Sequence, residues 1–219
     1  MKITIIYDNE AFDKSLKPDW GFSCLIEVFG RKILFDTGAN GDILLSNMKK
    51  LNIDPALIDM IFISHAHWDH TGGLLSFLKI NPAKLYIPSS CQEVPGSKEL
   101  IRVKDPVTIH ENIFSTGELK AQEQSLVIKY NKGVVLIAGC SHPGVREILK
   151  AASNYGRVVT LIGGLHGFKE FNMIQDLESI CPTHCTQFKE KIRELYPDKY
   201  IKGGVGRVIT MKVQGRVAA

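Results

Sequence analysis

Hydrophobic residues recur along the chain with two spacings, and these spacings predict alternating strands and helices. Apolar or alternating runs predict strands at residues 1–6, 22–28, 32–35, 60–63, 85–87, 126–130, 134–138, 158–162, 180–185 and 207–213. Helical spacing predicts helices at residues 42–51, 74–81, 145–154, 171–178 and 187–195. The run at 134–138 is uniformly apolar, so we expect that strand to be buried.

Two polar segments interrupt this pattern. Residues 9–20 contain Pro18, and residues 88–104 contain Pro95 and Gly96. Both segments predict irregular loops, and we expect both to line a pocket. The remaining order of strands, helix and strand occurs twice, without a linker or a low-complexity stretch. It suggests two related halves that face each other across a shared pocket, within one domain that spans residues 1–219.

Potential metal ligands follow the apolar strand at residues 60–63, in the stretch IFISHAHWDHTGG. The four potential ligands are His65, His67, Asp69 and His70. Alternate side chains of an extended segment point the same way, so the first two histidines can enter one pocket. A turn then carries the aspartate and the third histidine to a second position. Neutral imidazoles suit zinc, and a carboxylate beside them suits a second divalent ion.

Three later strands also end in a histidine. His142 stands in Gly-Cys-Ser-His-Pro-Gly, His166 in Gly-Gly-Leu-His-Gly, and His184 in Pro-Thr-His-Cys. One such histidine alone is more often a hydrogen-bonded structural residue, but the recurrence predicts that all three converge on one metal pocket. His110 differs because it is a lone histidine in an alternating run, and we expect it to be a solvated strand residue.

Composition narrows the classes of protein that fit. Of the 219 residues, 44% are hydrophobic, and no run approaches the roughly 18 apolar residues of a membrane span. The N-terminal segment lacks the apolar core and cleavage site of a signal peptide, which predicts a cytoplasmic location. Five scattered cysteines are then expected to be reduced thiols. The net charge of +4 is spread along the chain, which argues against a nucleic-acid partner and is compatible with an anionic small-molecule substrate.

The motif H-x-H-x-D-H followed by T-G-G resembles the signature of the metallo-β-lactamase-fold superfamily. The resemblance implies an α/β fold, namely a four-layer αββα sandwich. The later motifs G-C-S-H-P-G, G-G-x-H and P-x-H-C-T resemble a subgroup often labelled as dihydropterin-ribofuranosylaminobenzene phosphate synthases. From this subgroup label we carry over the fold and the metal site, not the product.

The resemblance also implies roles for individual residues. One metal would be held by His65, His67 and His142, and the other by Asp69, His70 and His184. His166 would be an additional ligand or a group that transfers protons and contacts the substrate. Asp36, in the element L-F-D-T-G, would orient a histidine ligand from behind. Cys140 stands where superfamily enzymes usually carry an aspartate that bridges the two metals.

These features lead us to expect a metal-dependent hydrolase that acts through a metal-bound hydroxide on a phosphoester or another ester or amide. Asp69 could also receive a proton from the attacking water. Zinc is the expected ion; the cysteine at position 140 leaves iron, manganese and single-metal occupancy open. Two rival hypotheses are an iron-binding redox protein of the same fold and a non-catalytic metal- or ligand-binding protein. The substrate and the oligomeric state are not specified by the sequence.

Overall fold

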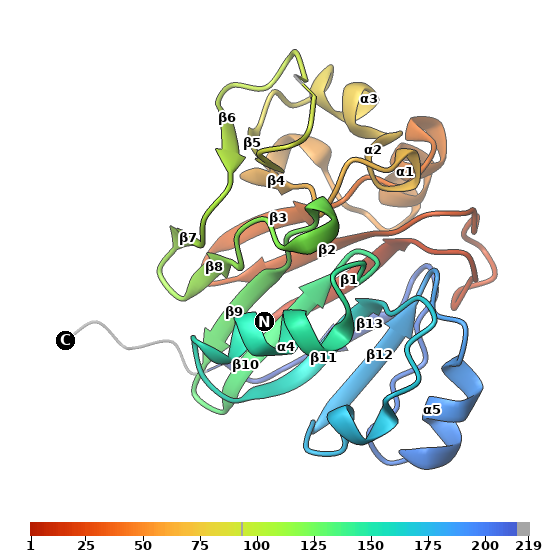
Figure 1. Cartoon of the computed structure of the whole chain (residues 1–219). Coiled ribbons are helices and arrows are strands. Elements are labelled where there is room, and N and C mark those ends of the chain that lie inside the picture. Colours follow the sequence, from red (N-terminus) through yellow and green to blue (C-terminus); the bar gives the residue numbers. More distant parts are fainter. Residues whose placement is uncertain (93, 214–219) are drawn as a thin grey trace.

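Two β-sheets pack face to face in the computed structural model, which describes residues 1–92 and 94–213 (Figure 1). Within these ranges, the first sheet has the strand order β13-β1-β2-β3-β4-β5-β6, and the second has the order β12-β11-β10-β9-β8-β7. The strands of the first sheet are β1 (Lys2–Tyr7), β2 (Ser23–Val28), β3 (Arg31–Phe35), β4 (Met60–Phe62), β5 (Lys84–Pro88), β6 (Leu100–Val103) and β13 (Val208–Thr210). Those of the second are β7 (Val107–His110), β8 (Ile113–Ser115), β9 (Leu126–Tyr130), β10 (Gly133–Ala138), β11 (Val158–Gly164) and β12 (Ser179–Thr183).

Helices cover the outer face of each sheet. The helices are α1 (Gly41–Lys50), α2 (Trp68–Thr71), α3 (Leu74–Leu78), α4 (Val145–Ser153) and α5 (Lys189–Leu195), and the 3-10 turns are Pro55–Leu57, Lys120–Gln122 and Phe171–Ile174. Leu44 of α1 packs in the cluster outside the first sheet, whereas Ile148 of α4 and Ile192 of α5 pack in the cluster outside the second. The predicted four-layer αββα arrangement is confirmed.

The inner faces of the two sheets meet in a single apolar cluster. Phe35 and Phe62 of the first sheet belong to this cluster together with Ile128 and Ile137 of the second, and all four side chains are fully buried. Strands with apolar residues on both faces, such as β10, are therefore sandwiched between the other sheet and a helix layer. This burial explains the uniformly apolar run that the sequence shows there.

Parallel pairing places several loops at one edge of each sheet. Strands β3, β4, β5 and β6 are parallel to one another, as are β10, β11 and β12 in the second sheet. The carboxyl ends of parallel strands share an edge, so the loops after β10, β11 and β12 emerge side by side. Each of these loops, and the one after β4, carries a predicted metal-binding histidine.

Three predicted elements differ from the structure. The segment 88–104, expected to be irregular, contains β6, which pairs with β5 as an exposed-edge strand. The helix expected at 74–81 ends after little more than one turn, at Leu78, and the helix expected at 171–178 is a 3-10 turn from Phe171 to Ile174. These segments are short, so packing rather than hydrophobic spacing decides their conformation.

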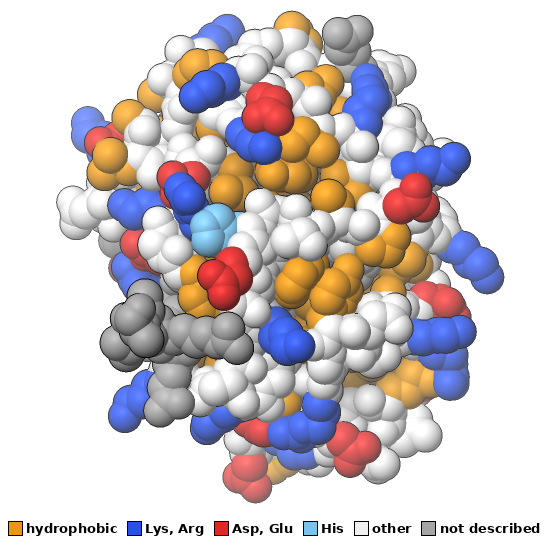
Figure 2. Space-filling model, turned by 90° about the vertical axis from the view of Figure 1, so that its left-hand side faces the viewer, with side chains coloured by type: hydrophobic (Ala, Val, Ile, Leu, Met, Phe, Trp, Pro, Cys, Tyr) orange, Lys and Arg blue, Asp and Glu red, His pale blue; other side chains and the backbone are white. Residues whose placement is uncertain are grey.

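The surface mixes charged and apolar side chains. On the face seen in Figure 2, Lys and Arg side chains lie singly among acidic and hydrophobic ones. Across residues 1–92 and 94–213, none of the helices has the length and apolar character needed to cross a bilayer.

Candidate metal centre

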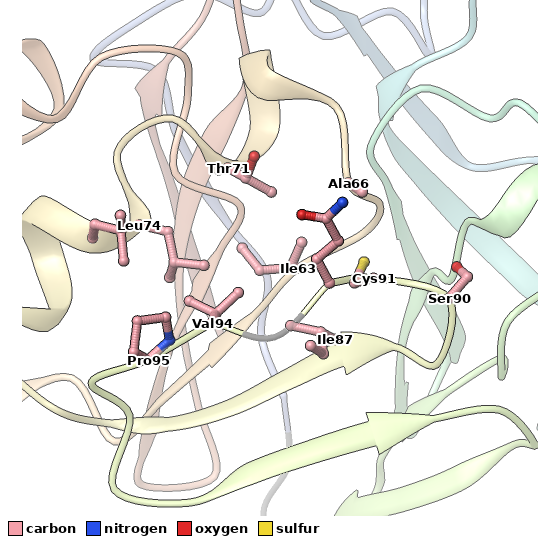
Figure 3. Close-up of a pocket in the computed structure, with 11 residues that line it drawn as sticks. Ile63, Ala66, Thr71, Leu74, Ile87, Ser90, Cys91, Val94 and Pro95 are labelled. Carbon is pink, nitrogen blue, oxygen red and sulfur yellow. The ribbon is translucent and has the colours of Figure 1, made fainter.

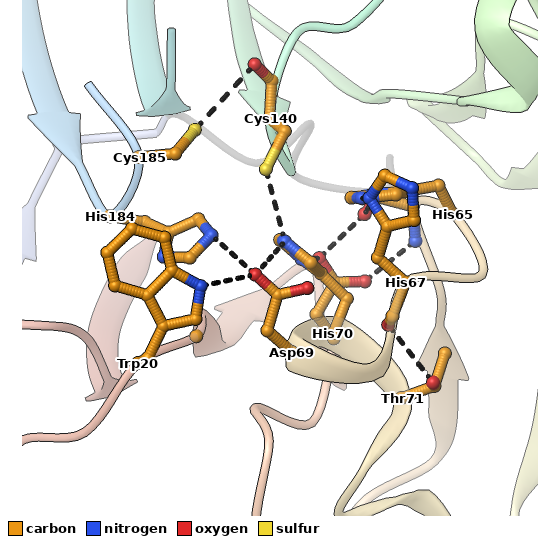
Figure 4. A network of polar contacts seen from close by, with 12 residues as sticks. Trp20, His65, His67, Asp69, His70, Thr71, Cys140, His184 and Cys185 are labelled. Carbon is orange, nitrogen blue, oxygen red and sulfur yellow. Dashed lines mark hydrogen bonds and ion pairs between the residues drawn. The ribbon is translucent and has the colours of Figure 1, made fainter. Parts of the chain in front are cut away.

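The predicted ligand residues lie together at the edge where the two sheets meet. His65 and His67 follow β4, and the short helix α2 then carries Asp69 and His70. The turn expected within the motif is therefore one helical turn. Within this group, Nε2 of His65 lies 3.0 Å from Nδ1 of His67, and the rings of His65 and His70 are 4.1 Å apart between centroids (Figure 4).

The second sheet contributes the other side of the cluster. The His142 ring lies 4.6 Å from that of His65, and the His184 ring lies 5.0 Å from that of His70, measured between centroids. Nε2 of His184 is 3.2 Å from Oδ2 of Asp69. The His166 Nε2 is 2.8 Å from the His142 Nε2. The structure thus brings together every residue that the sequence placed in the site.

Cys140 occupies the middle of this arrangement. Its Sγ lies 3.2 Å from Nε2 of His70 (Figure 4). Among the described residues, three groups of histidine and cysteine side chains could each hold a metal ion. Within each group the potential ligand atoms lie within 4.8 Å of one another, and Cys140 belongs to all three groups. The groups are His65 with Cys140 and His142, His70 with Cys140 and His184, and Cys140 with His166 and Cys185. The thiol therefore lies between the two halves, where the resemblance places a bridging group.

Each of four histidines has its Nδ1 held by a partner. The pairs are His65 with Ser64 Oγ at 2.8 Å, His70 with Asp36 Oδ2 at 2.7 Å, His142 with Glu123 Oε2 at 2.8 Å, and His184 with Asn9 Oδ1 at 2.9 Å. The Ser64 hydroxyl donates to Asp36, so it accepts from the imidazole N–H of His65. Such contacts place the proton of each ring on Nδ1 and leave the lone pair on Nε2, which is then the nitrogen that can bind an ion.

Glu123 is a site residue that the sequence did not reveal. Its buried carboxylate accepts hydrogen bonds from the backbone N–H groups of Cys140, Ser141 and His142, each at 2.9 Å, besides the contact with the His142 ring. Burial alone would raise the pKa of Glu123, but these hydrogen bonds lower it to about 2. Glu123 lies in a polar stretch without a motif, so no local signal marks it.

Residues near the N-terminus complete the support. The Trp20 indole N–H donates to Asp69 Oδ2 at 3.0 Å, and the Asp8 carboxylate accepts from the His184 backbone N–H at 2.9 Å. Together with Asn9, they show that the end of β1 and the loop 9–20 contact the site. We expected this loop to line a pocket, but its sequence did not identify the contacting residues.

Burial sets the charge of the cluster. Desolvation, followed by the charge of neighbouring histidines, lowers the pKa of His65 and of His70 to about 3. Both rings are therefore neutral at pH 7, the form that binds a metal ion. Desolvation also raises the pKa of Asp36 to about 7. Burial would raise the pKa of Asp69 too, but its contact with His184 and the charges of the His70 and His184 rings hold it well below its usual range.

Several observations fit an ion at this place. Nε2 of His184 is buried and makes no hydrogen bond to any described residue, which is costly for a polar atom. Nitrogen ligands about 2.0–2.1 Å from a tetrahedral zinc ion lie roughly 3.3 Å apart, close to the 3.0 Å between His65 and His67. The backbone is also strained here, with positive φ at Asp36, Ser141, His166 and His184. Strain of this kind gathers at functional sites.

Gly139 shows how closely the two halves approach. A Cβ atom at this position would lie 2.1 Å from the Ser64 hydroxyl and 3.1 Å from Nδ1 of His65. Any larger residue would push β10 away from the loop that follows β4. The glycine before Cys140 thus lets the thiol reach the histidines.

His110 lies apart from the cluster. It ends β7, and its Nδ1 is 3.4 Å from the backbone oxygen of Glu111. The ring is partly exposed, as expected for a solvated strand residue.

Two cavities border the cluster. The first, of about 550 Å³, reaches Ala66 and Thr71 in the motif that follows β4. Most of its other wall residues are apolar, among them Ile63, Leu74, Ile87 and Val94 (Figure 3). The second, of about 460 Å³, contains His166 and Lys169 next to the start of α4. The walls of both cavities are largely apolar, but the second also holds His166, Lys169 and Glu170, and we call it the polar cavity for these side chains.

The fold and the motifs agree with those of known proteins. Residues 20–112 match the family model of the metallo-beta-lactamase superfamily. The crystal structure of Tm1679, described as a metal-dependent hydrolase of the beta-lactamase superfamily, superposes with a TM-score of 0.79 at 23% identity and covers 96% of this chain and 99% of that one. The metallo-beta-lactamase fold protein YhfI from Bacillus subtilis gives a TM-score of 0.71 at 14% identity, with coverage of 95% and 98%. The chain thus has the metallo-β-lactamase fold.

One relative carries the name of the subgroup that the later histidine motifs resemble. The 7,8-dihydropterin-6-methyl-4-(beta-D-ribofuranosyl)-aminobenzene-5'-phosphate synthase of Methanocaldococcus jannaschii is 28% identical over an alignment that covers 91% of this chain and 95% of the relative. The resemblance expected from the histidine motifs is therefore confirmed. These comparisons do not test which side chains bind an ion, and those assignments stay predictions.

Proposed function

We propose that this protein is a metal-dependent hydrolase that cleaves an ester, a phosphoester or an amide. One observation carries the proposal: four histidines present Nε2 to a common centre, and each has its Nδ1 tied to a partner. Structural histidines do not need this shared orientation, whereas metal ligands do. His65, His67 and His142 would hold one ion, and Asp69, His70 and His184 would hold the other.

A divalent ion bound there would lower the pKa of a bound water to near 7 and would polarise the scissile carbonyl or phosphoryl oxygen. The protein's residues supply the rest. The Trp20 indole N–H donates to Asp69 Oδ2, and Nε2 of His184 lies 3.2 Å from the same oxygen, so the carboxylate has a fixed direction and stays ionised. Asp69 can then orient the attacking water and accept its proton.

His166 is placed to act on the leaving group. Its ring is half-buried beside His142 and also lines the polar cavity. Desolvation, followed by the charge of His142, lowers the pKa of His166. A histidine that contacts both the cluster and a solvent-filled space can pass a proton to a departing oxygen or nitrogen.

The two cavities indicate the shape of the substrate. The apolar cavity suits a hydrophobic group. In the polar cavity, Lys169 can contact an anionic group, although Glu170 and apolar side chains line the same space. The named relative is a synthase whose product carries a 5'-phosphate, which supports an anionic small molecule. We therefore expect a substrate with one apolar and one charged part. We expect zinc as the ion.

The first experiment identifies the metal and the reaction together. Protein purified without added metal is assayed for bound ions and for hydrolysis of a phosphodiester, a phosphomonoester, a lactone and a thioester. Hydrolysis that is lost in His67→Ala, but kept in the matched control His110→Ala, supports the proposal because His110 lies outside the cluster.

The position of Cys140 carries a second candidate, an iron-binding redox protein. A thiol 3.2 Å from His70 gives the centre a softer ligand than the usual carboxylate, and thiolate binds iron as well as zinc. Tightly held iron with oxygen uptake and no hydrolysis would favour this candidate. Retained metal without turnover of any substrate would instead favour a non-catalytic binding protein.

A further inference from the structure

Two cysteines and a histidine lie together on the loops that the second sheet contributes to the cluster. Cys140, His166 and Cys185 follow β10, β11 and β12, three neighbouring parallel strands. Their two Sγ atoms and one ring nitrogen all lie within 4.8 Å of one another. His166 and Cys185 belong to neither of the two ligand groups assigned above to the hydrolytic centre. Cys140 lies between the two places, and Nε2 of His166 is 2.8 Å from Nε2 of His142.

The local backbone is built to bring these groups together. A Cβ atom at Gly164 would lie 2.7 Å from Cys185 Sγ and 3.2 Å from the Cys140 Cα, so a side chain there would separate the two loops. His166 adopts a positive φ of 44°, and its backbone oxygen accepts a hydrogen bond from the Gln187 N–H at 2.9 Å. These contacts hold the loops after β11 and β12 in register.

The donor set has a definite chemistry. Two thiolates and one imidazole suit zinc, cadmium and copper(I), whereas magnesium and calcium prefer oxygen. Sulfur ligands at about 2.3 Å from a tetrahedral ion lie roughly 3.8 Å apart, so small rotations inward from the present distances close the set. Three protein ligands leave one position open, and the polar cavity at His166 gives access from solvent.

We propose that Cys140, His166 and Cys185 form an additional position for one soft metal ion, which shares the Cys140 thiolate with the neighbouring centre. This position binds zinc or cadmium in the reduced protein. Its three side chains are placed by their own strands and loops, so the site can be tested separately from the hydrolytic function, and an ion bound there would keep His166 from acting on the leaving group.

Cobalt(II) titration of the reduced, chelator-stripped full chain tests this directly. Cobalt bound to thiolates absorbs in the near ultraviolet, and the absorbance reports the sulfur ligands independently of activity. We expect Cys185→Ser to bind one equivalent less than the unchanged protein and to lose about half of this absorption. The matched control Cys91→Ser, a buried cysteine in the wall of the apolar cavity, should retain both. Equal stoichiometry and equal spectra in Cys185→Ser and the unchanged protein would overturn the proposal.

Two further measurements keep the test decisive. His67→Ala removes a ligand of the hydrolytic centre, yet it should retain the absorption that depends on Cys185, so that failure of the two proposals can be told apart. If Cys185→Ser does not fold, alkylation of Cys185 in the unchanged protein is followed by mass spectrometry with and without cadmium. Protection of about tenfold or more is expected, and an unchanged alkylation rate would refute the site.

Discussion

The two halves of the site are built in different ways. The first sheet supplies His65, His67, Asp69 and His70 from a single loop and one turn of helix. The second supplies its residues from the loops after three parallel strands: Cys140 and His142 after β10, His166 after β11 and His184 after β12. One half is therefore fixed by local sequence and the other by sheet topology. In the first half, the spacing of ligands within one motif indicates a metal site. In the second half, only the recurrence of a histidine at several strand ends indicates it.

The supports behind the ligands differ as well. His65 is backed by the residue before it, Ser64, and through it by Asp36. His142 depends on Glu123, and His184 depends on Asn9, which is 175 residues distant in sequence. Asp36 and Glu123 lie 34 and 19 residues from the histidines that they contact, so the contact of His184 with Asn9 is by far the longest in sequence. His184 should therefore be the most sensitive to changes outside the motifs.

Removal of a ligand from each half should give the largest effects. By resemblance, His70 and His184 hold the same ion, so His70→Ala and His184→Ala should each lose one equivalent of bound metal. Loss of several kcal/mol of charge stabilisation corresponds to a decrease in kcat of about 10³-fold. Metal analysis and steady-state kinetics check this. A tenfold or smaller loss in either variant would show that its half contributes less than proposed.

Changes behind the ligands should be smaller and unequal. Glu123→Gln replaces a carboxylate that accepts two hydrogen bonds at each oxygen, and the new amide N–H₂ cannot accept from the two donors that it faces. We expect metal affinity to fall about 10–100-fold and unfolding free energy to fall by about 3–5 kcal/mol.

Asp36→Asn is the matched change in the first half. Asp36 accepts from Ser64 and contacts His70, but desolvation raises its pKa to about 7, so a neutral residue is tolerated better there. Metal titration and urea unfolding of the metal-free variants compare the two. Equal destabilisation by Asp36→Asn and Glu123→Gln would contradict the proposed difference in charge between these two carboxyl groups.

Acid should destabilise the metal-free protein. The folded pKa of His65 and His70, about 3, lies below the unfolded value of 6.5. The unfolded chain therefore binds more protons between these values, and stability falls as the pH falls from about 6.5 to 3. Asp36 has the opposite effect on stability. Its pKa is about 7 in the folded chain and 3.8 in the unfolded chain, so its contribution stabilises the folded protein at low pH and is lost as the pH rises through about 7.

Thermal unfolding between pH 3 and pH 8 measures the balance. We expect a lower Tm at pH 4 than at pH 6.5, and a steeper fall in Asp36→Asn, which lacks the opposing contribution. A Tm that rises towards pH 4 would mean that the carboxyl, not the two imidazoles, dominates the titration of the cluster.

The smallest effect concerns the apolar cavity beside the first half. Leu75 lines this cavity and is 53% exposed, so Leu75→Lys should fold normally. For substrates with a hydrophobic group, kcat/KM should fall about tenfold, while substrates without one should be unaffected. Leu57→Lys, at a similarly exposed leucine outside the cavity wall, is the control. An equal loss for both kinds of substrate would place the hydrophobic group elsewhere.

Much of the fold follows from hydrophobic spacing because most strands are buried on at least one face. The edge strand β6 was missed, since its residues are only partly buried and follow a loop rich in turn formers. Helix α3 was predicted too long because apolar residues continue past Leu78 to Ile80, which is half exposed. Short elements at an edge depend on neighbours that no local pattern encodes.

The residues of the candidate site were predicted where their chemistry stands out in a motif. Glu123 and Asn9 could not be found this way, because a single carboxylate or amide in a polar segment resembles many surface residues. Their roles arise from the folded chain, which brings them within hydrogen-bond distance of His142 and His184.

Asn9 also ties the order of synthesis to the order of assembly. Its side-chain oxygen contacts Nδ1 of His184 at 2.9 Å, and its amide nitrogen donates to the backbone oxygen of the same residue at 3.2 Å. On the ribosome, the histidine loop emerges long before residue 184, so a growing chain offers its first four ligands in an open arrangement. The centre closes only when the last strands reach the first. We therefore expect the proposed ion to bind only late in the life of the nascent chain.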